Sequence, residues 1–308
     1  MKNKKISRRS ALRSIAGAGL AVGSIGTVNA RRRSDSEQTY MQAVRLRSRL
    51  KKLQQLPAGS PEAKRLEAET RPGFQQYLSQ DPREAFRNYL TNAGFSWSFA
   101  HGERVSEEDE EVGTQAYDIS KLSIDITLTI DCYNENEVFV DCFWDFDPKC
   151  TTYAWEKNGG NSPNDVIGMY WPSTDYSRID NSEYTTNKYV LVGGEYGDLD
   201  SNGIAAEFND ADAWYFQSDA TEPDCSGLSA GVGIYGGYGC KAIQNNPEDR
   251  PATRLVSGDY RHTQGSCGIN SVGIGTGGLS VGYSCGDPLV WDYTLDEGED
   301  GSSSNCAP

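Results

Sequence analysis

The C-terminal two thirds of the chain alternate apolar and polar residues in the manner of half-buried β-strands. Residues 124–130 and 137–146 alternate most clearly, and the polar segment 133–136 between them favours a turn, so we predict a β-hairpin. Similar short segments follow, divided by Gly, Asn and Asp, at residues 166–171, 189–192, 205–208, 213–216, 229–235, 255–261, 271–274, 279–283 and 289–293. Many short strands separated by turns predict an antiparallel β-sandwich or barrel.

The segment before this region has the periodicity of helices. Apolar residues recur at roughly helical spacing between Tyr40 and Leu56. Ser60 followed by Pro61 is typical of a second helix start, and a third short helix fits residues 81–92, with Gly94 after its end. We therefore expect an α+β chain, in which a small helical segment precedes an antiparallel β-sandwich or barrel.

The first thirty residues read as an export signal. A basic start leads through the pair Arg8-Arg9 to a Gly- and Ala-rich apolar stretch, and small residues at Val28 and Ala30 fit cleavage after Ala30. The paired arginines are typical of a twin-arginine signal, and the alternative is an ordinary secretory signal with a chance pair. The apolar run is too short for an anchor. We expect a secreted protein without a transmembrane anchor, which meets the twin-arginine translocase and signal peptidase during export.

The distribution of charge divides the exported chain in two. The net charge is −15, and it falls to −21 without the six basic residues of the leader. Residues 31–116 carry a net charge of +1 and residues 117–308 a net charge of −22. We predict a helical segment or pro-region at 31–105, an acidic linker at 106–116 and a disulfide-stapled β domain at 117–308. Such an excess of acids argues against nucleic acid as a partner, because phosphates would be repelled.

All eight cysteines lie in the predicted β domain. Because exported proteins meet an oxidising environment, we predict that these cysteines form four disulfides. The candidates are Cys132, Cys142, Cys150, Cys225, Cys240, Cys267, Cys285 and Cys306. Nearness in sequence favours pairs 132–142, 225–240 and 267–285, with 150–306 as the remaining bridge, although the sequence allows other pairings. Zinc is the rival use of cysteine, but the chain has no Cys-x-x-Cys spacing.

One short segment suggests a metal. Asp198, Asp200 and Asn202, followed by Gly203, resemble the start of a calcium loop, in which hard oxygen atoms surround the cation. The twelfth position of such a loop would be Asn209 where Glu is expected, and a metal-free turn is the alternative reading. We expect no cofactor other than this possible calcium ion.

The sequence offers little support for catalysis. His262 is the one histidine of the β-rich part, and no Gly-x-Ser-x-Gly nucleophile motif occurs. Pairs of carboxylates are so abundant in this acidic chain that their presence does not distinguish a hydrolase from a non-catalytic protein. Aromatic clusters at 143–144, 170–171, 214–216 and 291–293 could stack on sugars, with core packing as the alternative for most of them.

A twin-arginine leader ahead of an acidic, Lys-poor domain resembles the exported proteins of halophilic archaea, whose surfaces hold counter-ions in molar salt. More narrowly, the chain is similar to a loose group of Cys-rich β-domain proteins exported by these organisms. The resemblance rests on residues 128–131, on 165–171, and on Arg254 with the segment 260–263, where Gln264 replaces the Trp that often follows in the group. It implies no activity and no functional residue.

These observations favour a secreted, non-catalytic β domain that binds a partner, a surface glycan or the cell envelope. The alternative is a secreted hydrolase that acts through two carboxylates in a cleft. A third reading is the precursor of a halocin-like antimicrobial peptide, released from the Cys-rich end once the helical segment is removed.

Overall fold

A computed structural model describes residues 24–105, 119–132, 136–148, 165–192, 199–208, 234–245, 256–262, 269–275, 278–283, 291–295 and 301–303. The chain divides into two compact units, residues 1–38 and 39–308. Every contact discussed below lies within the second unit. The predicted twin-arginine pair, the predicted linker at 106–116 and the predicted strand at 213–216 lie outside the described residues.

The helices of the described residues include two that begin where the sequence predicts, after Ser60 and after Asp81. The helices are α1 (Ser24–Gln55), α2 (Pro61–Ala68), the short 3₁₀ helix η1 (Pro72–Tyr77) and α3 (Pro82–Asn92). The Ser60 hydroxyl accepts a hydrogen bond from the backbone amide of Ala63 at 3.2 Å and thereby caps α2. Asp81 caps α3 in the same way, because its carboxylate accepts from the amides of Arg83 and Glu84 at 2.8 and 3.4 Å.

Antiparallel strands make up most of the remaining described chain. The first sheet has the order β15-β1-β2-β3-β10-β5, with β6 also paired to β10, and the second has the order β14-β11-β4-β9-β7, with β8 paired to β9. The strands β12 and β13 form a separate hairpin. Their bounds are β1 (Phe95–Val105), β2 (Ile119–Asp131), β3 (Glu137–Pro148), β4 (Asp165–Tyr170), β5 (Tyr176–Arg178), β6 (Tyr184–Thr185), β7 (Val190–Val192), β8 (Leu199–Asp200), β9 (Gly203–Phe208), β10 (Ile234–Gln244), β11 (Ser257–His262), β12 (Ile269–Gly275), β13 (Gly278–Tyr283), β14 (Trp291–Leu295) and β15 (Gly301–Ser303).

The two sheets form a sandwich whose core follows from the apolar alternation. Ile124, Ile126, Leu128 and Ile130 all point from β2 to the same side, because side chains alternate between the faces of a strand. They pack with apolar residues of β4, β9 and β11 in the second sheet, including Ile167, Ile204, Phe208 and Tyr260. The predicted class, a small helical segment followed by an antiparallel β-sandwich, is therefore confirmed.

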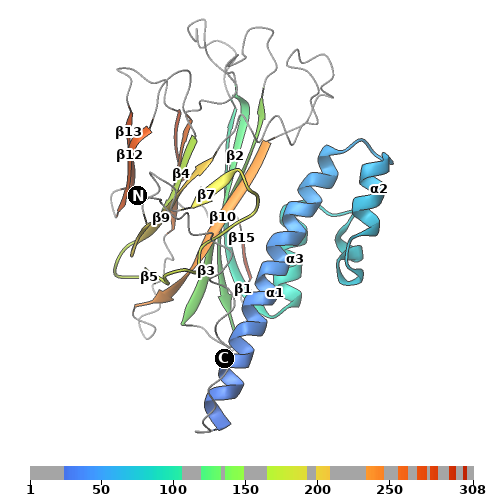
Figure 1. The fold of residues 1–308 in the computed structure, drawn as a ribbon, viewed down its shortest axis with the longest axis horizontal. Coiled ribbons are helices and arrows are strands. Elements are labelled where there is room, and N and C mark those ends of the chain that lie inside the picture. The colour runs from blue at the N-terminus through green and yellow to red at the C-terminus, as the bar shows by residue number, and fades with distance from the viewer. Residues whose placement is uncertain are drawn as a thin grey trace, which may run out of the picture. The chain divides into compact units, whose positions relative to one another are not determined.

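The opposite face of the first sheet is covered by helices (Figure 1). Tyr40 of α1 stacks on Phe139 of β3, with ring centroids 3.9 Å apart and planes inclined by 13°. Phe86 of α3 meets Phe143 of β3 edge to face at 5.7 Å. On the other side of the sandwich, the β12–β13 hairpin packs on the second sheet through the cluster Val166, Ala205, Ile269, Val272, Ile274 and Leu279.

The helical segment ends earlier than the sequence led us to expect. Residues 95–105, which we placed in the helical segment at 31–105, form strand β1 and pair along their whole length with β2. The alternation of Phe95, Trp97 and Phe99 with serines was the signal for a strand. Strand β1 thus joins the helices covalently to the sheet that they cover.

Candidate ligand pocket between helix α1 and the first sheet

Helical cover buries the polar face of the central strands. Asp125, Thr127 and Thr129 of β2 and Asp141 of β3 are all buried, although they point away from the apolar core. Burial of polar groups is unfavourable unless they find partners. The stability of the interface between helices and sheet therefore depends on the hydrogen bonds and ion pairs that these residues make.

Asp125 gathers three basic side chains from different parts of the chain. Arg47 of α1 donates a hydrogen bond to its Oδ2 atom, and Arg83 of α3 donates to the same oxygen through Nε at 2.7 Å. His101 of β1 lies with Nδ1 2.7 Å from Oδ1. Burial raises the pKa of Asp125, but the charge of Arg47, the hydrogen bond from His101 and the charge of Arg83 outweigh it and lower the pKa to about 2. Asp125 is thus a charged hub that joins helices to sheet.

A second set of contacts continues this network toward the surface. Lys51 of α1 pairs with Asp145 of β3, with Nζ and Oδ2 2.9 Å apart. Arg83 donates to the Ser123 hydroxyl at 3.1 Å and also lies 3.9 Å from Asp145. The Arg47 guanidinium lies over the ring of Phe143 at 3.9 Å, a cation–π contact that supports its orientation.

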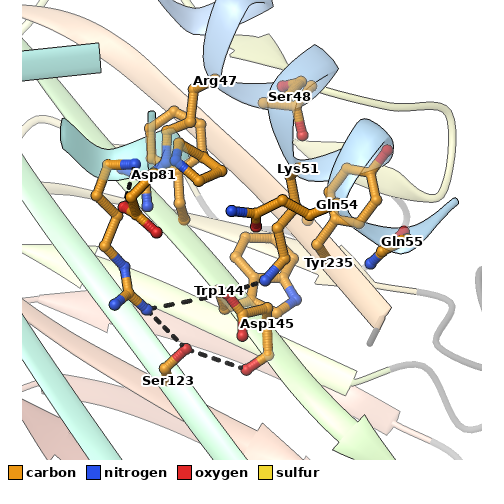
Figure 2. A pocket seen from close by; sticks show the side chains of 15 residues that line it. Arg47, Ser48, Lys51, Gln54, Gln55, Asp81, Ser123, Trp144, Asp145 and Tyr235 are labelled. Atoms are coloured by element: carbon orange, nitrogen blue, oxygen red, sulfur yellow. Dashed lines mark hydrogen bonds and ion pairs between the residues drawn. The ribbon is translucent and has the colours of Figure 1, made fainter. Parts of the chain in front are cut away.

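These residues form one wall of a pocket of about 380 Å³. Figure 2 shows it between α1 and strands of the first sheet. Its lining is Arg47, Ser48, Lys51, Gln54, Gln55, Asp81, Pro82, Arg83, Ser123, Phe143, Trp144, Asp145, Thr186, Tyr235 and Gly236. The volume is at the lower end of the range for small-molecule sites.

Each charged side chain of the lining already has at least one partner, although the buried Nη1 atom of Arg47 has none among the described residues. Arg47 and Arg83 are held by Asp125, and Lys51 is held by Asp145. The Asp81 carboxylate caps α3. The lining also carries neutral amides and hydroxyls, such as those of Gln54 and Tyr235. Burial and the neighbouring Tyr189 raise the pKa of Tyr235 to about 12, so its hydroxyl is neutral near pH 7 and can donate as well as accept.

The predicted calcium residues are only partly described. Asp198 lies outside the described residues, while Asp200 and Asn202 belong to the tight turn that joins β8 to β9. The backbone carbonyl of Asn202 accepts a hydrogen bond from the Trp171 amide at 2.9 Å. The turn therefore contributes a backbone hydrogen bond to the fold, and calcium binding there stays a prediction. Within the described part of the chain, no three His, Cys, Asp or Glu side chains are grouped so that they could share a metal ion.

The cysteines depart from the predicted pattern. Cys142 and Cys240 are free thiols buried in the sandwich core, so the pairs 132–142 and 225–240 are wrong, as is the prediction that all eight cysteines are bridged. Cys132 is disulfide-bonded. Cys142 and Cys240 point inward with the apolar residues of β3 and β10, where a free cysteine behaves as a small apolar side chain. Cys150, Cys225, Cys267, Cys285 and Cys306 lie outside the described residues.

Two of the aromatic candidates belong to the core. Trp144 and Trp171 are almost fully buried inside the sandwich and present no sugar-stacking face to solvent. The candidates at 214–216 lie outside the described residues.

The sequence did not reveal the hub around Asp125. One signal was present: Arg47 occupies the face of α1 that also carries Tyr40, Ala43, Val44 and Leu50, all of them buried. A basic residue on the apolar face of a helix indicates a buried acidic partner. The partner itself could not be chosen among so many acids.

Comparison with known proteins adds a distant likeness. No family model matches the chain, and no curated protein matches it. Among solved structures, the pilus backbone RrgB of Streptococcus pneumoniae matches with a TM-score of 0.25 and 10% sequence identity, over 55% of this chain and 32% of that chain. The match thus covers about a third of the pilus protein's length.

None of the helices described here is both long and apolar enough to cross a bilayer.

Proposed function

We propose that the protein is a secreted, non-catalytic binding domain of a halophile, and that its pocket binds a neutral, hydroxyl-rich ligand such as part of a surface glycan. The leader and the acidic composition of the exported chain support secretion into brine. The pocket supports binding, and the observation that carries this proposal is the mutual neutralisation of the charges that line it.

Charge neutralisation favours a neutral ligand over an anion. An anion would have to compete with Asp125 and Asp145 for Arg47, Arg83 and Lys51, and would lose the hydrogen bonds already formed there. A neutral ligand rich in hydroxyls can instead exchange hydrogen bonds with Gln54 and Tyr235 without breaking an ion pair. Such groups give orientation and specificity in small-molecule sites.

The two carboxylates of the pocket, Asp81 and Asp145, already make structural contacts and are therefore poorly suited to hydrolysis. A hydrolase of the carboxylate type needs one acid free to hold a proton and one free to act as nucleophile or base. Asp81 is engaged by two backbone amides, and Asp145 is engaged by Lys51. This arrangement favours binding over acid–base catalysis.

The contacts of the helical segment also weigh against the reading as a peptide precursor. Removal of residues 31–105 would take away Arg47, Arg83 and strand β1, and would leave Asp125 buried or exposed without its partners. It would also remove Lys51 and Gln54 and thus one wall of the pocket.

The binding proposal is tested with the exported protein on a glycan array, followed by calorimetric titration of any ligand found. We expect Tyr235→Ala and Gln54→Ala to weaken binding at least about tenfold, because each removes a polar contact at a buried ligand. Ile243→Ala is the matched control, since Ile243 lies on the same strand as Tyr235, is exposed and does not line the pocket. Unchanged affinity in both pocket variants, or turnover of the ligand, would contradict the proposal.

A further inference from the structure

Asp141 of β3 lies on the face of the first sheet that the helices cover. Phe139 and Phe143 project from β3 on the same face, because side chains alternate between the two faces of a strand. Tyr40 of α1 stacks on Phe139 at 3.9 Å, and Phe86 of α3 meets Phe143 at 5.7 Å. Asp141 is therefore buried between two aromatic contacts that join the helices to the sheet.

Among the described residues, neither carboxylate oxygen of Asp141 has a hydrogen-bond partner. The titratable side chains of the elements around it are Tyr40 and Arg47 of α1, Arg83 of α3, His101 of β1, Asp125 of β2, Cys142 of β3, Arg178 of β5, Tyr184 of β6 and Cys240 of β10. Asp125 holds the first two arginines and the histidine, Glu183 holds Arg178, and the two thiols belong to the core on the opposite face of the sheet. The basic groups near Asp141 are thus paired with other acids.

The side of Asp141 that faces β10 is crowded. Gly239 of β10 is paired with Asp141, and a Cβ atom placed on this glycine would lie 2.7 Å from Asp141 Oδ1. The same point lies 2.5 Å from Tyr184 Oη and 2.6 Å from the Val140 carbonyl oxygen. Side chains and backbone therefore fill the space on this side, and they leave no room for a counter-ion. A proton on the carboxyl group needs no such room.

Burial without a partner favours the neutral form of Asp141. An unpaired carboxylate is far more costly to bury than a neutral acid, because it loses its hydration and gains no counter-charge. Burial accordingly raises the pKa of Asp141 well above its ordinary value. The helical cover and the protonated acid are therefore linked, since each favours the other.

We propose that Asp141 is a pH-sensitive latch, which stays buried as the neutral acid while α1 covers β3 and which releases α1 from β3 when it ionises. Ionisation passes the proton to solvent, and the carboxylate that remains gains hydration only when the cover around Tyr40 opens. The sandwich core lies on the other face of the sheet and does not include Asp141, so the two sheets stay packed when the latch opens. The inference does not depend on the ligand proposed for the pocket.

The sign of the pH dependence follows from the raised pKa. The contribution of Asp141 to stability is fully present below its ordinary pKa of 3.8 and is lost as the pH rises toward the pKa of the folded protein. Because one proton is released on opening, the equilibrium constant for opening rises about tenfold for each pH unit in this range. This direction is opposite to that of Asp125, whose lowered pKa makes acid destabilising.

The test is amide hydrogen exchange of the full exported chain between about pH 5 and pH 9, read by mass spectrometry for residues 40–50 of α1 and corrected for the intrinsic exchange rate. We expect the opening constant of the wild type to rise at least about tenfold over this range. Asp141→Asn, which places a neutral side chain of the same shape there, should remove this rise. Asp180→Asn is the control, because the Asp180 side chain is 81% exposed and its loss should leave the rise intact.

A second measurement needs no variant at position 141 and therefore applies even if Asp141→Asn does not fold. In wild-type protein labelled with ¹³C at the aspartate carboxyl carbons, we expect the resonance assigned to Asp141 to keep the chemical shift of a protonated acid at pH 7. An ionised Asp141 at this pH in the folded protein would overturn the proposal. So would exchange in α1 that depends on pH equally in the wild type and in Asp141→Asn.

Discussion

Arg47 of α1 donates a hydrogen bond to Asp125 of β2 across a sequence separation of 78 residues. Both side chains are almost fully buried, so the pair is shielded from the water and salt that weaken ion pairs at the surface. Arg83 and His101 reach the same carboxylate from α3 and β1. The helical segment is therefore fastened to the sandwich by charge as well as by its aromatic contacts.

Loss of the Asp125 charge should destabilise the folded protein. We expect Asp125→Asn to lower the free energy of unfolding by about 3–5 kcal/mol, because it leaves the buried Arg47 without a counter-charge. Denaturant titration of the two proteins measures the difference. Lys51→Ala is the control, since it breaks the more exposed pair with Asp145 and should cost about 1 kcal/mol or less. A similar loss of unfolding free energy in the two variants would show that Asp125 contributes no more to stability than the more exposed pair of Lys51 and Asp145.

Acid should weaken the same hub. The pKa of Asp125 is about 2 in the folded protein against an ordinary value of 3.8, so the folded state binds this proton less readily than the unfolded chain. The resulting stabilisation, about 2 kcal/mol, is fully present above pH 5 and is lost as the pH falls from about 4 to 2. We expect unfolding free energy measured across this range to fall less steeply in Asp125→Asn than in the wild type. If the unfolding free energy of the two proteins fell equally steeply between pH 4 and pH 2, the lowered pKa of Asp125 would be contradicted.

The two free thiols should be inert while the protein is folded. Burial raises the pKa of both Cys142 and Cys240, which disfavours the reactive thiolate as well as excluding reagents. We expect iodoacetamide to modify neither residue in the native protein and both after unfolding without reductant, as read by peptide mass mapping. A peptide containing either residue in a disulfide would contradict the structure of the core.

A methyl group at Gly239 should crowd the first sheet. The new Cβ atom would lie within 2.7 Å of three oxygen atoms, one of them in the backbone, so we expect Gly239→Ala to destabilise the fold by about 1–3 kcal/mol. Thermal unfolding measures the loss of stability. Gly73→Ala is the control, because a Cβ atom at Gly73 meets nothing within 4 Å. A Gly239→Ala protein as stable as the Gly73→Ala protein would contradict this close packing.

Much of the fold could be predicted because the sandwich core follows local rules. Alternation marked β2 and β3, and capping residues marked the starts of α2 and α3. The predicted strand at 229–235 overlaps β10 only at its start. Residues 236, 237 and 239 are glycines, and the structure uses them where Trp144, Phe143 and Tyr184 crowd the strand. Close approach of this kind is a tertiary property that the local sequence does not contain.

The site was harder to foresee, because it depends on which face of the sheet is covered. An Asp that alternates with apolar residues normally points to solvent, and no local pattern distinguishes Asp125 and Asp141 from other such residues. Helical cover makes one the centre of an ion-pair hub and leaves the other buried without a hydrogen-bond partner among the described residues. The free cysteines were missed for a related reason, since nearness in sequence does not tell which cysteines face the core.

Intact-mass analysis of the exported protein tests most directly whether the helical segment and the sandwich are one functional body. We predict a single species that begins at Arg31 and retains residues 31–105, together with the pocket wall that they provide. A mature chain that begins after residue 105 would contradict this account, because it would lack Arg47, Arg83 and strand β1.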